Sequence, residues 1–345
     1  MPTHLETELR EQGAALAGRA EEGRAAAERA AELLGGQGVD YLLIAARGSS
    51  DNAARYGQYL LGLDGGLAVG LAAPWLYGHG HRAPRLPGAA LLGISQSGRS
   101  RDIVAVLEAG RLQGRPTIAI TNEPASPLAQ AADVVIPLGV GEERSVAATK
   151  TYVASLHALA QLGAAMRPSR VTPEVLAIVP EMVTTLTAAQ LESRERFDRL
   201  AEASLLTAVG RGLDYATACE AGMKLRELGG TPAEAFSTPD LLHGPVAALT
   251  PGSALWIASG VAHTEEAELE SFRQLTGRTG LHVAVSADPR VLELAEIPVQ
   301  LPVLPEWATP LLGVVPAQVA ALRLAQIRRV SIDHPHGLSK VTVTT

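Results

Sequence analysis

The sequence predicts an α/β protein with two doubly wound parallel sheets in tandem. Short apolar runs alternate with helical patterns, which is typical of parallel sheets covered on both faces. This order of segments also repeats along the chain. Arg47 aligns with Arg211 and Ser95 with Ser259 at one and the same offset, and the strand that ends near position 121 recurs near position 286, at an offset larger by one. A constant offset over three segments indicates a duplicated domain, and 345 residues suit two domains.

The elements follow in a simple order. Apolar strands are expected in the first copy at 41–46, 66–73, 89–95, 117–121 and 133–138, and a long helix over 151–166 closes it. The second copy repeats this pattern at 205–212, 254–260 and 281–302. The predicted organisation is an N-terminal helical segment (1–35), a first domain (36–167), a linker with a helix (168–200), a second domain (201–330) and a tail that closes the active site (331–345).

Composition limits the classes of partner. The net charge is −7 and no run of Lys or Arg stands out, which argues against nucleic acid. No uninterrupted apolar run is long enough to span a membrane and the N-terminus lacks an apolar segment, so neither a membrane partner nor a signal peptide is expected. The single cysteine, Cys219, excludes an internal disulfide and is compatible with a reducing cytosol. His79 and His81 have no acidic or thiol partner nearby, so no metal or cofactor is expected.

The segment "SQSGRS" (residues 95–100, the serine loop) joins an apolar run to a helical pattern. Ligands of open α/β sheets bind beyond the carboxyl ends of strands, where helix N-termini favour anions. The loop is therefore either a phosphate cradle or a serine-rich helix cap. A second such turn, "RGSS" (47–50), favours the cradle. The second copy, with "SGVAHT" (259–264), has fewer hydroxyls, so the first copy is expected to hold the principal ligand site.

Three further residues carry acid–base chemistry. Lys224 and Glu227 are three apart on a predicted helix and share a face, either as a surface ion pair or as part of a site. His243 follows in a turn-rich loop. A lysine, a carboxylate and an imidazole form a useful proton-transfer set.

Lys340 lies in the C-terminal tail. The tail has no other charge after this lysine and alternates Val with Thr, so it is expected to be docked.

Several motifs in one order carry a family resemblance: "RGSS", "SQSGRSRD", "SVAATK", "GMKLRELGG", "LLHGP" and "DHPHGLSKVTV". Together they make the chain resemble the SIS (sugar isomerase) family, and more narrowly the isomerase half of glucosamine-6-phosphate synthase, which has two flavodoxin-like SIS domains. The resemblance implies that a sugar phosphate is bound by Ser49, Ser50, Ser95, Gln96, Ser97 and Ser100, with the loop from Val146 to Ala148 against the sugar.

The same resemblance implies catalytic roles. Glu227 would move a proton between C1 and C2, and Lys224 would assist through the sugar hydroxyls. His243 would open the ring from the neighbouring subunit, which implies a homodimer. Lys340 would form a Schiff base with the ketose.

The sequence also departs from the synthase. Arg99 replaces an acid, Ala148 replaces a serine, and the tail reads "HGLSK" rather than "RNLAK", which leaves substrate detail open. Pro2 stands where the synthase has its glutaminase nucleophile, so glutamine hydrolysis by this chain is not expected.

The expected activity is that of a cytoplasmic phosphosugar amine isomerase and deaminase, which converts glucosamine 6-phosphate and water to fructose 6-phosphate and ammonia. Four alternatives stay open. They are a deglycase, an isomerase of another 6-phosphosugar or its amine, a synthase-like aminotransferase that uses external ammonia, and a non-catalytic sugar-phosphate sensor.

Overall fold

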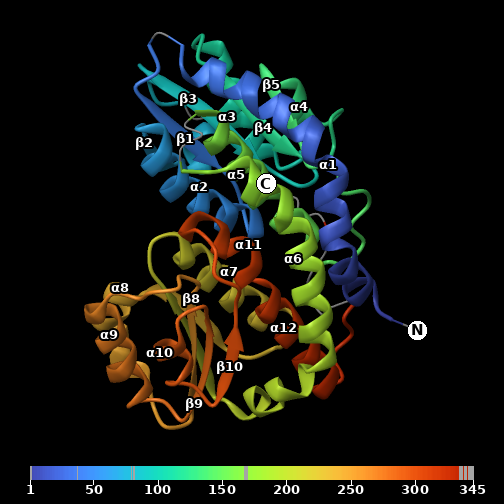
Figure 1. Ribbon diagram of the computed structural model, residues 1–345. Helices are drawn as coiled ribbons and strands as arrows, with labels where there is room; N and C mark the ends of the chain where they lie inside the picture. Colours follow the sequence, from blue (N-terminus) through green and yellow to red (C-terminus); the bar gives the residue numbers. More distant parts are fainter. Residues whose placement is uncertain are drawn as a thin grey trace. The chain divides into compact units, whose positions relative to one another are not determined.

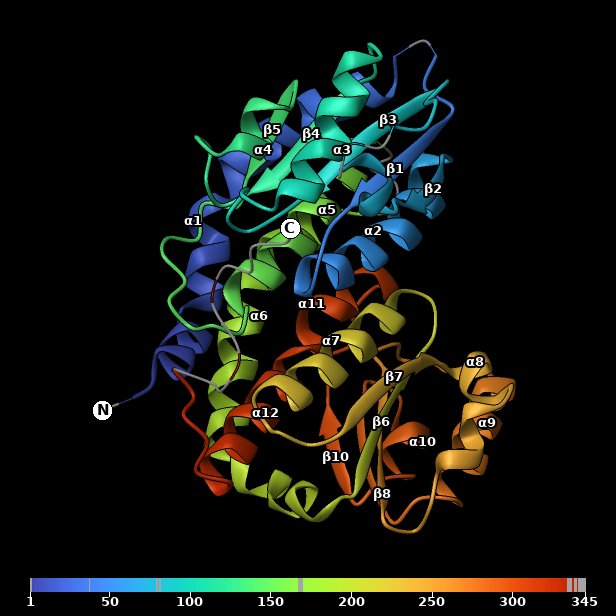
Figure 2. The same cartoon turned by 180° about the vertical axis from the view of Figure 1, so that it is seen from behind.

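The computed structural model describes residues 2–36, 38–78, 80, 82–166, 170–333, 337 and 340. The chain divides into two compact units, each built around one five-stranded sheet (Figures 1 and 2). One unit contains Gln12–Glu143 and Lys150–Pro180, together with Lys340. The other contains Glu181–Ser339, Arg144–Thr149 and the first eleven residues. The domain limits expected from the sequence differ from the bounds of these two units and stay a prediction.

The first sheet is parallel throughout, in the order β2-β1-β3-β4-β5. Every residue of the inner strands β3 and β4 is buried, as expected for strands covered on both faces, whereas the third inner strand, β1, is partly buried at two positions. The strands are β1 (Tyr41–Ala45), β2 (Ala68–Leu71), β3 (Ala89–Ile94), β4 (Thr117–Thr121) and β5 (Val134–Pro137). The helices of this part are α1 (His4–Leu34), α2 (Ser49–Gly65), η1 (Pro74–Tyr77), α3 (Arg101–Leu112), α4 (Pro127–Gln130) and α5 (Lys150–Met166).

Helix α1 is fastened to the first sheet by a buried arginine. Arg19 donates to Gln161 Oε1 (2.9 Å), to the Pro137 carbonyl (3.2 Å) and to His157 Nδ1 (2.7 Å). Burial lowers the pKa of His157 to about 3, so its imidazole is neutral and can accept this hydrogen bond. Burial also lowers the pKa of Arg19, to about 10. The N-terminal helical segment is therefore part of a packed core.

The second sheet has the order β10-β9-β8-β6-β7, again parallel throughout. Its strands are β6 (Leu205–Gly210), β7 (Ala233–Ser237), β8 (Ser253–Ser259), β9 (Leu281–Ser286) and β10 (Ile297–Gln300). Helical elements around it and leading into it are α6 (Pro173–Glu192), η2 (Arg194–Glu202), α7 (Leu213–Glu227), α8 (Thr238–Leu242), η3 (Pro245–Ala248), α9 (Glu266–Thr276), α10 (Pro289–Leu292), η4 (Glu306–Ala308), α11 (Thr309–Gly313) and α12 (Val315–Ile327).

The two sheets share one topology, which confirms the predicted tandem of doubly wound domains. Numbered within each sheet, both orders read 2-1-3-4-5. The first strand-to-helix turn is also the same, because Gly48 and Gly212 both have φ 57°, a left-handed conformation that favours glycine. Strand β7 was not expected from the sequence. It is an edge strand with the sequence AEAFS, which lacks a continuous apolar run.

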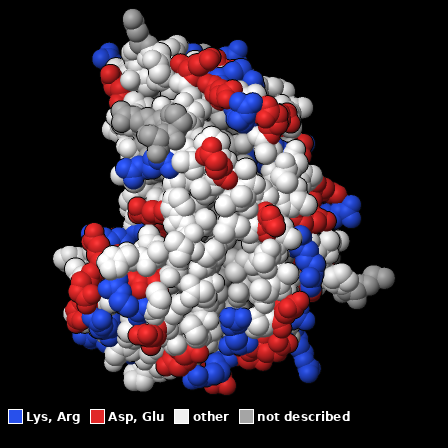
Figure 3. All heavy atoms as spheres, in the orientation of Figure 1, with Lys and Arg blue, Asp and Glu red and all other residues white. Residues whose placement is uncertain are grey.

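Within the described part of the chain, two helical stretches are long and apolar enough to cross a membrane by composition alone, although the sequence has no uninterrupted apolar run of that length. They are Pro173–Glu192 and Glu306–Ile327. The most apolar window of the second is 94% buried inside the fold, as in a core helix of a globular protein, whereas that of the first is 33% buried. On the face shown in Figure 3, acidic and basic side chains are interspersed.

Candidate functional site

The serine-rich turns of the first domain lie at the carboxyl ends of two neighbouring strands. Strand β1 leads into the turn before α2, and β3, its parallel neighbour, leads into the serine loop. This is the topological switch point of the sheet, where open α/β proteins bind ligands. An ion pair joins the two turns, because the Arg47 guanidinium lies 2.8 Å from Oδ2 of the buried Asp102 at the start of α3.

Two of the serine hydroxyls accept hydrogen bonds from the backbone of the loop. Ser95 Oγ accepts from the Gly98 N–H (3.2 Å) and lies 3.5 Å from Ser100 Oγ, while Ser97 Oγ accepts from the Arg99 N–H (3.3 Å). A hydroxyl that accepts from the backbone still has its own O–H to donate. Ser100 is the N-cap of α3, but its side chain makes no capping hydrogen bond. The helix-cap interpretation therefore does not account for all three hydroxyls.

The backbone of the serine loop also has free donors. In the described part of the chain, the N–H groups of Gln96, Ser97 and Ser100 have no hydrogen-bond acceptor. Ser49 and Ser50 are the first two residues of α2, whose N-cap, Gly48, has no side-chain capping bond. The free N–H groups of the serine loop, together with serine hydroxyls at the N-termini of two helices, suit an anion with several oxygens.

Gly98 gives the serine loop its shape. Its φ is +60°, and a Cβ at this position would overlap Oγ and Cβ of Ser126. Ser126 begins α4, where its hydroxyl accepts from the Ala129 N–H (3.3 Å). Both the left-handed conformation and the close approach therefore require glycine.

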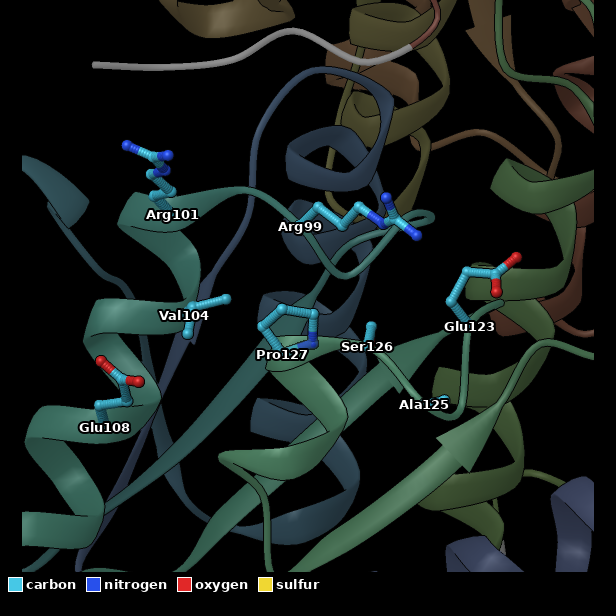
Figure 4. A pocket seen from close by; sticks show the side chains of 8 residues that line it. All are labelled: Arg99, Arg101, Val104, Glu108, Glu123, Ala125, Ser126 and Pro127. Atoms are coloured by element: carbon cyan, nitrogen blue, oxygen red, sulfur yellow. The ribbon is translucent and has the colours of Figure 1, made fainter.

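A hollow of about 530 Å³ opens beside the serine loop (Figure 4). Its wall includes Arg99 and Arg101 from one side and Glu123 and Ser126 from the other. Arg99 extends toward Glu123, whereas Arg101 points away. The lining contains none of the predicted phosphate-binding residues, so we assign it no part in phosphate binding.

The predicted sugar-contacting loop is half-buried at Val146 and Ala148. The backbone just before this loop is bound by Glu8 of α1, whose carboxylate accepts from the Ser145 N–H (3.2 Å) and from the Arg144 N–H. The loop is thus anchored by its backbone, which leaves the two predicted side chains partly accessible.

The acid–base pair lies at the end of α7. Lys224 Nζ donates to Glu227 Oε2 at 2.9 Å, as their spacing predicts, and lies 3.3 Å from Glu220 Oε1. Lys224 and Glu220 are buried, whereas the Glu227 side chain is 29% exposed. Burial alone would lower the pKa of Lys224, but the two carboxylates outweigh it and raise that pKa. The pair is therefore not the surface ion pair that was the simpler interpretation, and Glu227 is the accessible end of a fixed, charged cluster.

The two remaining catalytic candidates come from a loop and from the tail. His243 is exposed and follows α8 as its C-cap, with its backbone N–H bonded to Pro239 and Asp240 carbonyls. Lys340 Nζ lies 2.7 Å from Oε2 of Glu143, which is buried. The lysine of the tail is docked, as expected. The rest of the alternating tail and the pair His79 and His81 lie outside the described residues.

Glu143 and Glu220 were missed by the sequence analysis. Glu220 could have been found, because it lies four residues before Lys224 on the same predicted helix. Glu143 carries no comparable signal, because its partner is 197 residues away. Among the described residues, no group of three His, Cys, Asp or Glu side chains is placed to hold a metal.

The fold defines a protein of two tandem doubly wound α/β domains. Its candidate ligand site lies at the carboxyl ends of β1 and β3 in the first sheet. Residues 39–165 match the SIS domain family. The glutamine–fructose-6-phosphate aminotransferase (isomerizing) of Pyrococcus horikoshii is 29% identical over 324 residues, which cover 92% of this chain and 54% of that enzyme. The chain thus spans about half the length of the curated relatives it matches.

Solved structures show the same fold. A protein of Silicibacter pomeroyi DSS-3, described as a candidate phosphosugar isomerase, superposes with a TM-score of 0.84 at 28% identity, over 95% of this chain and 99% of the other. Glucosamine-6-phosphate deaminase from Thermotoga maritima superposes with a TM-score of 0.76 at 21% identity, over 99% and 100%. Residues 39–165 are thus a SIS domain, and the chain as a whole has the fold of two tandem flavodoxin-like SIS domains and is related to the isomerase part of the aminotransferase.

Proposed function

We propose that this chain is a phosphosugar isomerase whose substrate is a 6-phosphosugar amine, and that it converts glucosamine 6-phosphate and water to fructose 6-phosphate and ammonia. The observation that carries the proposal is the cluster on α7. A partly exposed carboxylate, Glu227, is held 2.9 Å from a buried ammonium, Lys224, which is in turn held by Glu220. A fixed carboxylate that can reach a substrate is what proton transfer between adjacent carbons requires.

The phosphate end of the substrate is assigned to the first domain. The hydroxyls of Ser49, Ser50, Ser95, Ser97 and Ser100, with the Gln96 side chain and the free N–H groups of the serine loop, would bind the 6-phosphate. The loop at Val146 and Ala148 would contact the sugar. The name of the relatives, which act on fructose 6-phosphate, supports a sugar phosphate as the ligand.

The reaction then proceeds in three balanced steps. His243 assists ring opening by moving a proton from the C1 hydroxyl to the ring oxygen. Glu227 removes the proton from C2 and returns it at C1, while a proton of the amine passes to the C1 oxygen, so that the amino aldose becomes the imine of the ketose; Lys224 stabilises the negative charge that develops on oxygen. Water adds to C2 of the imine and ammonia leaves, which gives fructose 6-phosphate.

Lys340 offers a covalent route for the last step. Its amine would add to C2 and expel ammonia, and water would then hydrolyse the new Schiff base to release the ketose and restore the lysine. The amine must lose a proton first, and the Glu143 carboxylate, 2.7 Å away, can accept it. We also expect a cytoplasmic homodimer in which His243 acts on the partner's substrate.

Release of ammonia from a panel of 6-phosphosugar amines tests the proposal. The panel contains glucosamine 6-phosphate, galactosamine 6-phosphate and a fructose–amino acid 6-phosphate conjugate, with fructose 6-phosphate measured as a product. Fructose 6-phosphate with external ammonia tests the reverse, synthase-like direction. Glu227→Gln should abolish turnover, and Glu202→Gln, which alters an exposed carboxylate, should not. Tight binding of fructose 6-phosphate without turnover of any panel member would instead establish a sensor.

A further inference from the structure

The second domain keeps two hydroxyl positions of the serine loop, but the backbone donors there are already occupied. Ser259 and Thr264 take the positions of Ser95 and Ser100, and their hydroxyls lie 3.1 Å apart, against 3.5 Å in the first domain. A cavity of about 310 Å³ lies over this second loop, lined also by Arg211 and Gly212 of the turn after β6. The second domain therefore retains the framework of an anion site.

The backbone donors of the second loop bond to carboxylates of the chain itself. The Gly260 N–H, which corresponds to the free N–H of Gln96, donates to Asp214 Oδ2 at 2.8 Å. The Thr264 N–H, which corresponds to that of Ser100, donates to Asp288 Oδ2 at 2.7 Å. Both carboxylates are buried.

Asp214 is the aligned counterpart of Ser50, at the same offset that relates Arg211 to Arg47. In the first domain this position carries a small hydroxyl on the first turn of α2, and the N–H of Gln96 in the serine loop has no acceptor among the described residues. In the second domain it carries a carboxylate whose other oxygen, Oδ1, accepts from Thr309 Oγ1 at 3.2 Å. The carboxylate is thus fixed from two sides, by the loop and by the start of α11.

We propose that the Asp214 carboxylate is a built-in occupant of the anion position of the second domain, so that each chain binds one phosphosugar, through its first domain. Ser50 and Asp214 are then the residues that decide which copy of the fold takes the ligand. The identity of the ligand as a phosphosugar rests on the proposed function, whereas the occupied position is a property of the second domain alone.

The other charges around the cavity also disfavour the binding of a phosphate. Glu265, Glu268 and Glu306 also line it, against the side chains of Arg211 and His263. A phosphate in this cavity would meet an excess of carboxylates as well as the loss of its backbone donors. Glu268 aligns with Val104 of the first domain, so this carboxylate is particular to the second copy.

The test counts binding sites by isothermal titration with fructose 6-phosphate and, separately, with inorganic phosphate, at pH 8. The variant Asp214→Ser/Glu268→Val gives the second domain the residues of the first at these two positions. It should bind two equivalents per chain where the unaltered protein binds one, with the new site at least tenfold tighter than any residual binding. Asp214→Asn is the matched control, because its amide oxygen can still accept from Gly260 and should keep the count at one.

Two results would overturn the inference: a second site in the unaltered protein, or an unchanged count in the folded double variant. Where the double variant does not fold, the variant Ser95→Ala/Ser97→Ala tests which domain binds the ligand. It should lose all binding of fructose 6-phosphate. One remaining equivalent per chain would place a ligand in the second domain and contradict the inference. If the unaltered protein binds no fructose 6-phosphate, the proposed function fails. The inorganic phosphate series on the double variant and on Asp214→Asn still decides whether Asp214 occupies the anion position.

Discussion

Lys340 Nζ and Glu143 Oε2 are 2.7 Å apart, and the Glu143 side chain is completely buried. The same carboxylate accepts from the N–H (3.0 Å) and the hydroxyl (2.7 Å) of Thr151, in the first turn of α5. Three donors therefore fix one carboxylate, and that carboxylate in turn fixes the tail lysine. A buried charge held by three hydrogen bonds is costly to disturb, because its partners would be left unsatisfied.

Glu143→Gln should separate positioning of Lys340 from binding of the substrate. The amide has nearly the same shape but cannot take the proton of Lys340, so we expect kcat to fall roughly 100-fold with little change in KM. Borohydride trapping of a Lys340–ketose adduct should weaken in parallel. Glu142→Gln, which alters the exposed neighbour, is the matched control. Turnover within twofold of the unaltered protein would remove Glu143 from the mechanism.

Lys224 and Glu227 should differ in what they contribute. Glu227→Gln removes a partly exposed carboxylate and leaves Lys224 paired with Glu220, so we expect a loss of activity of at least about 10³-fold with a free energy of unfolding changed by roughly 1 kcal/mol or less. Lys224→Met leaves the buried Glu220 without its cation and should cost about 3–5 kcal/mol. Urea unfolding beside the ammonia assay distinguishes the two, and equal destabilisation by both would contradict the separation.

Gly98 should be needed for two reasons that a matched variant can separate. Gly98→Ala introduces a Cβ at φ +60° and against Ser126, whereas Gly114→Ala introduces one at φ +65° with no neighbour within 4 Å. Each should lose about 1 kcal/mol to backbone strain. Only Gly98→Ala should lose a further ~1–3 kcal/mol to overpacking and raise KM for the phosphosugar. Similar KM values in the two variants would argue that the serine loop does not bind the substrate.

Mixed dimers test whether His243 acts across a subunit interface. Chains carrying Glu227→Gln and chains carrying His243→Ala should each be inactive alone. In a verified heterodimer, one site would combine both changes and the other would be intact, so we expect up to half of the unaltered activity. If each site uses its own His243, every site carries one defect and no activity returns.

The repetition of the fold could be predicted from the sequence because continuous apolar runs mark buried parallel strands, and the constant offset aligned them. Strand β7 was not predicted, because an edge strand is buried on fewer sides and its sequence AEAFS has no apolar run. The Lys224–Glu227 contact followed from helical spacing alone. Its burial did not, because burial depends on which elements cover that face of α7.

The candidate site shows the same division between local and distant information. The serine loop could be located because its hydroxyls are contiguous and follow a strand. Glu143 could not, because nothing in the local sequence links it to Lys340. The occupied donors of the second loop also depend on distant partners, Asp214 and Asp288, which lie on other turns. The second copy was expected to have lost its anion site because it lost hydroxyls. Two hydroxyls remain there, and the two carboxylates accept from the backbone N–H groups that an anion would need.

The buried Asp214 should make the stability of the second domain depend on pH in an unusual direction. Burial raises its pKa to about 7; hydrogen bonds from Gly260 and Thr309 act against this, and the nearby carboxylates of Glu306 and Glu268 add to it. Between about pH 4 and pH 7 the unfolded chain has lost this proton while the folded chain keeps it. The folded state then binds more protons, so the free energy of unfolding decreases as the pH rises through this range and is constant above it.

The variant Asp214→Asn lacks this titration, so it should gain stability relative to the unaltered protein by roughly 4 kcal/mol between pH 4 and pH 8. Comparison of the two proteins cancels the titration of groups that do not interact with Asp214, and Asp288 keeps its lowered pKa, which is due mainly to its hydrogen bond with Arg290. A Trp75→Phe background leaves Trp256 and Trp307, both buried around the second sheet, as fluorescent reporters of that unit during urea unfolding. A difference in stability that does not change with pH would show that Asp214 is ionised throughout.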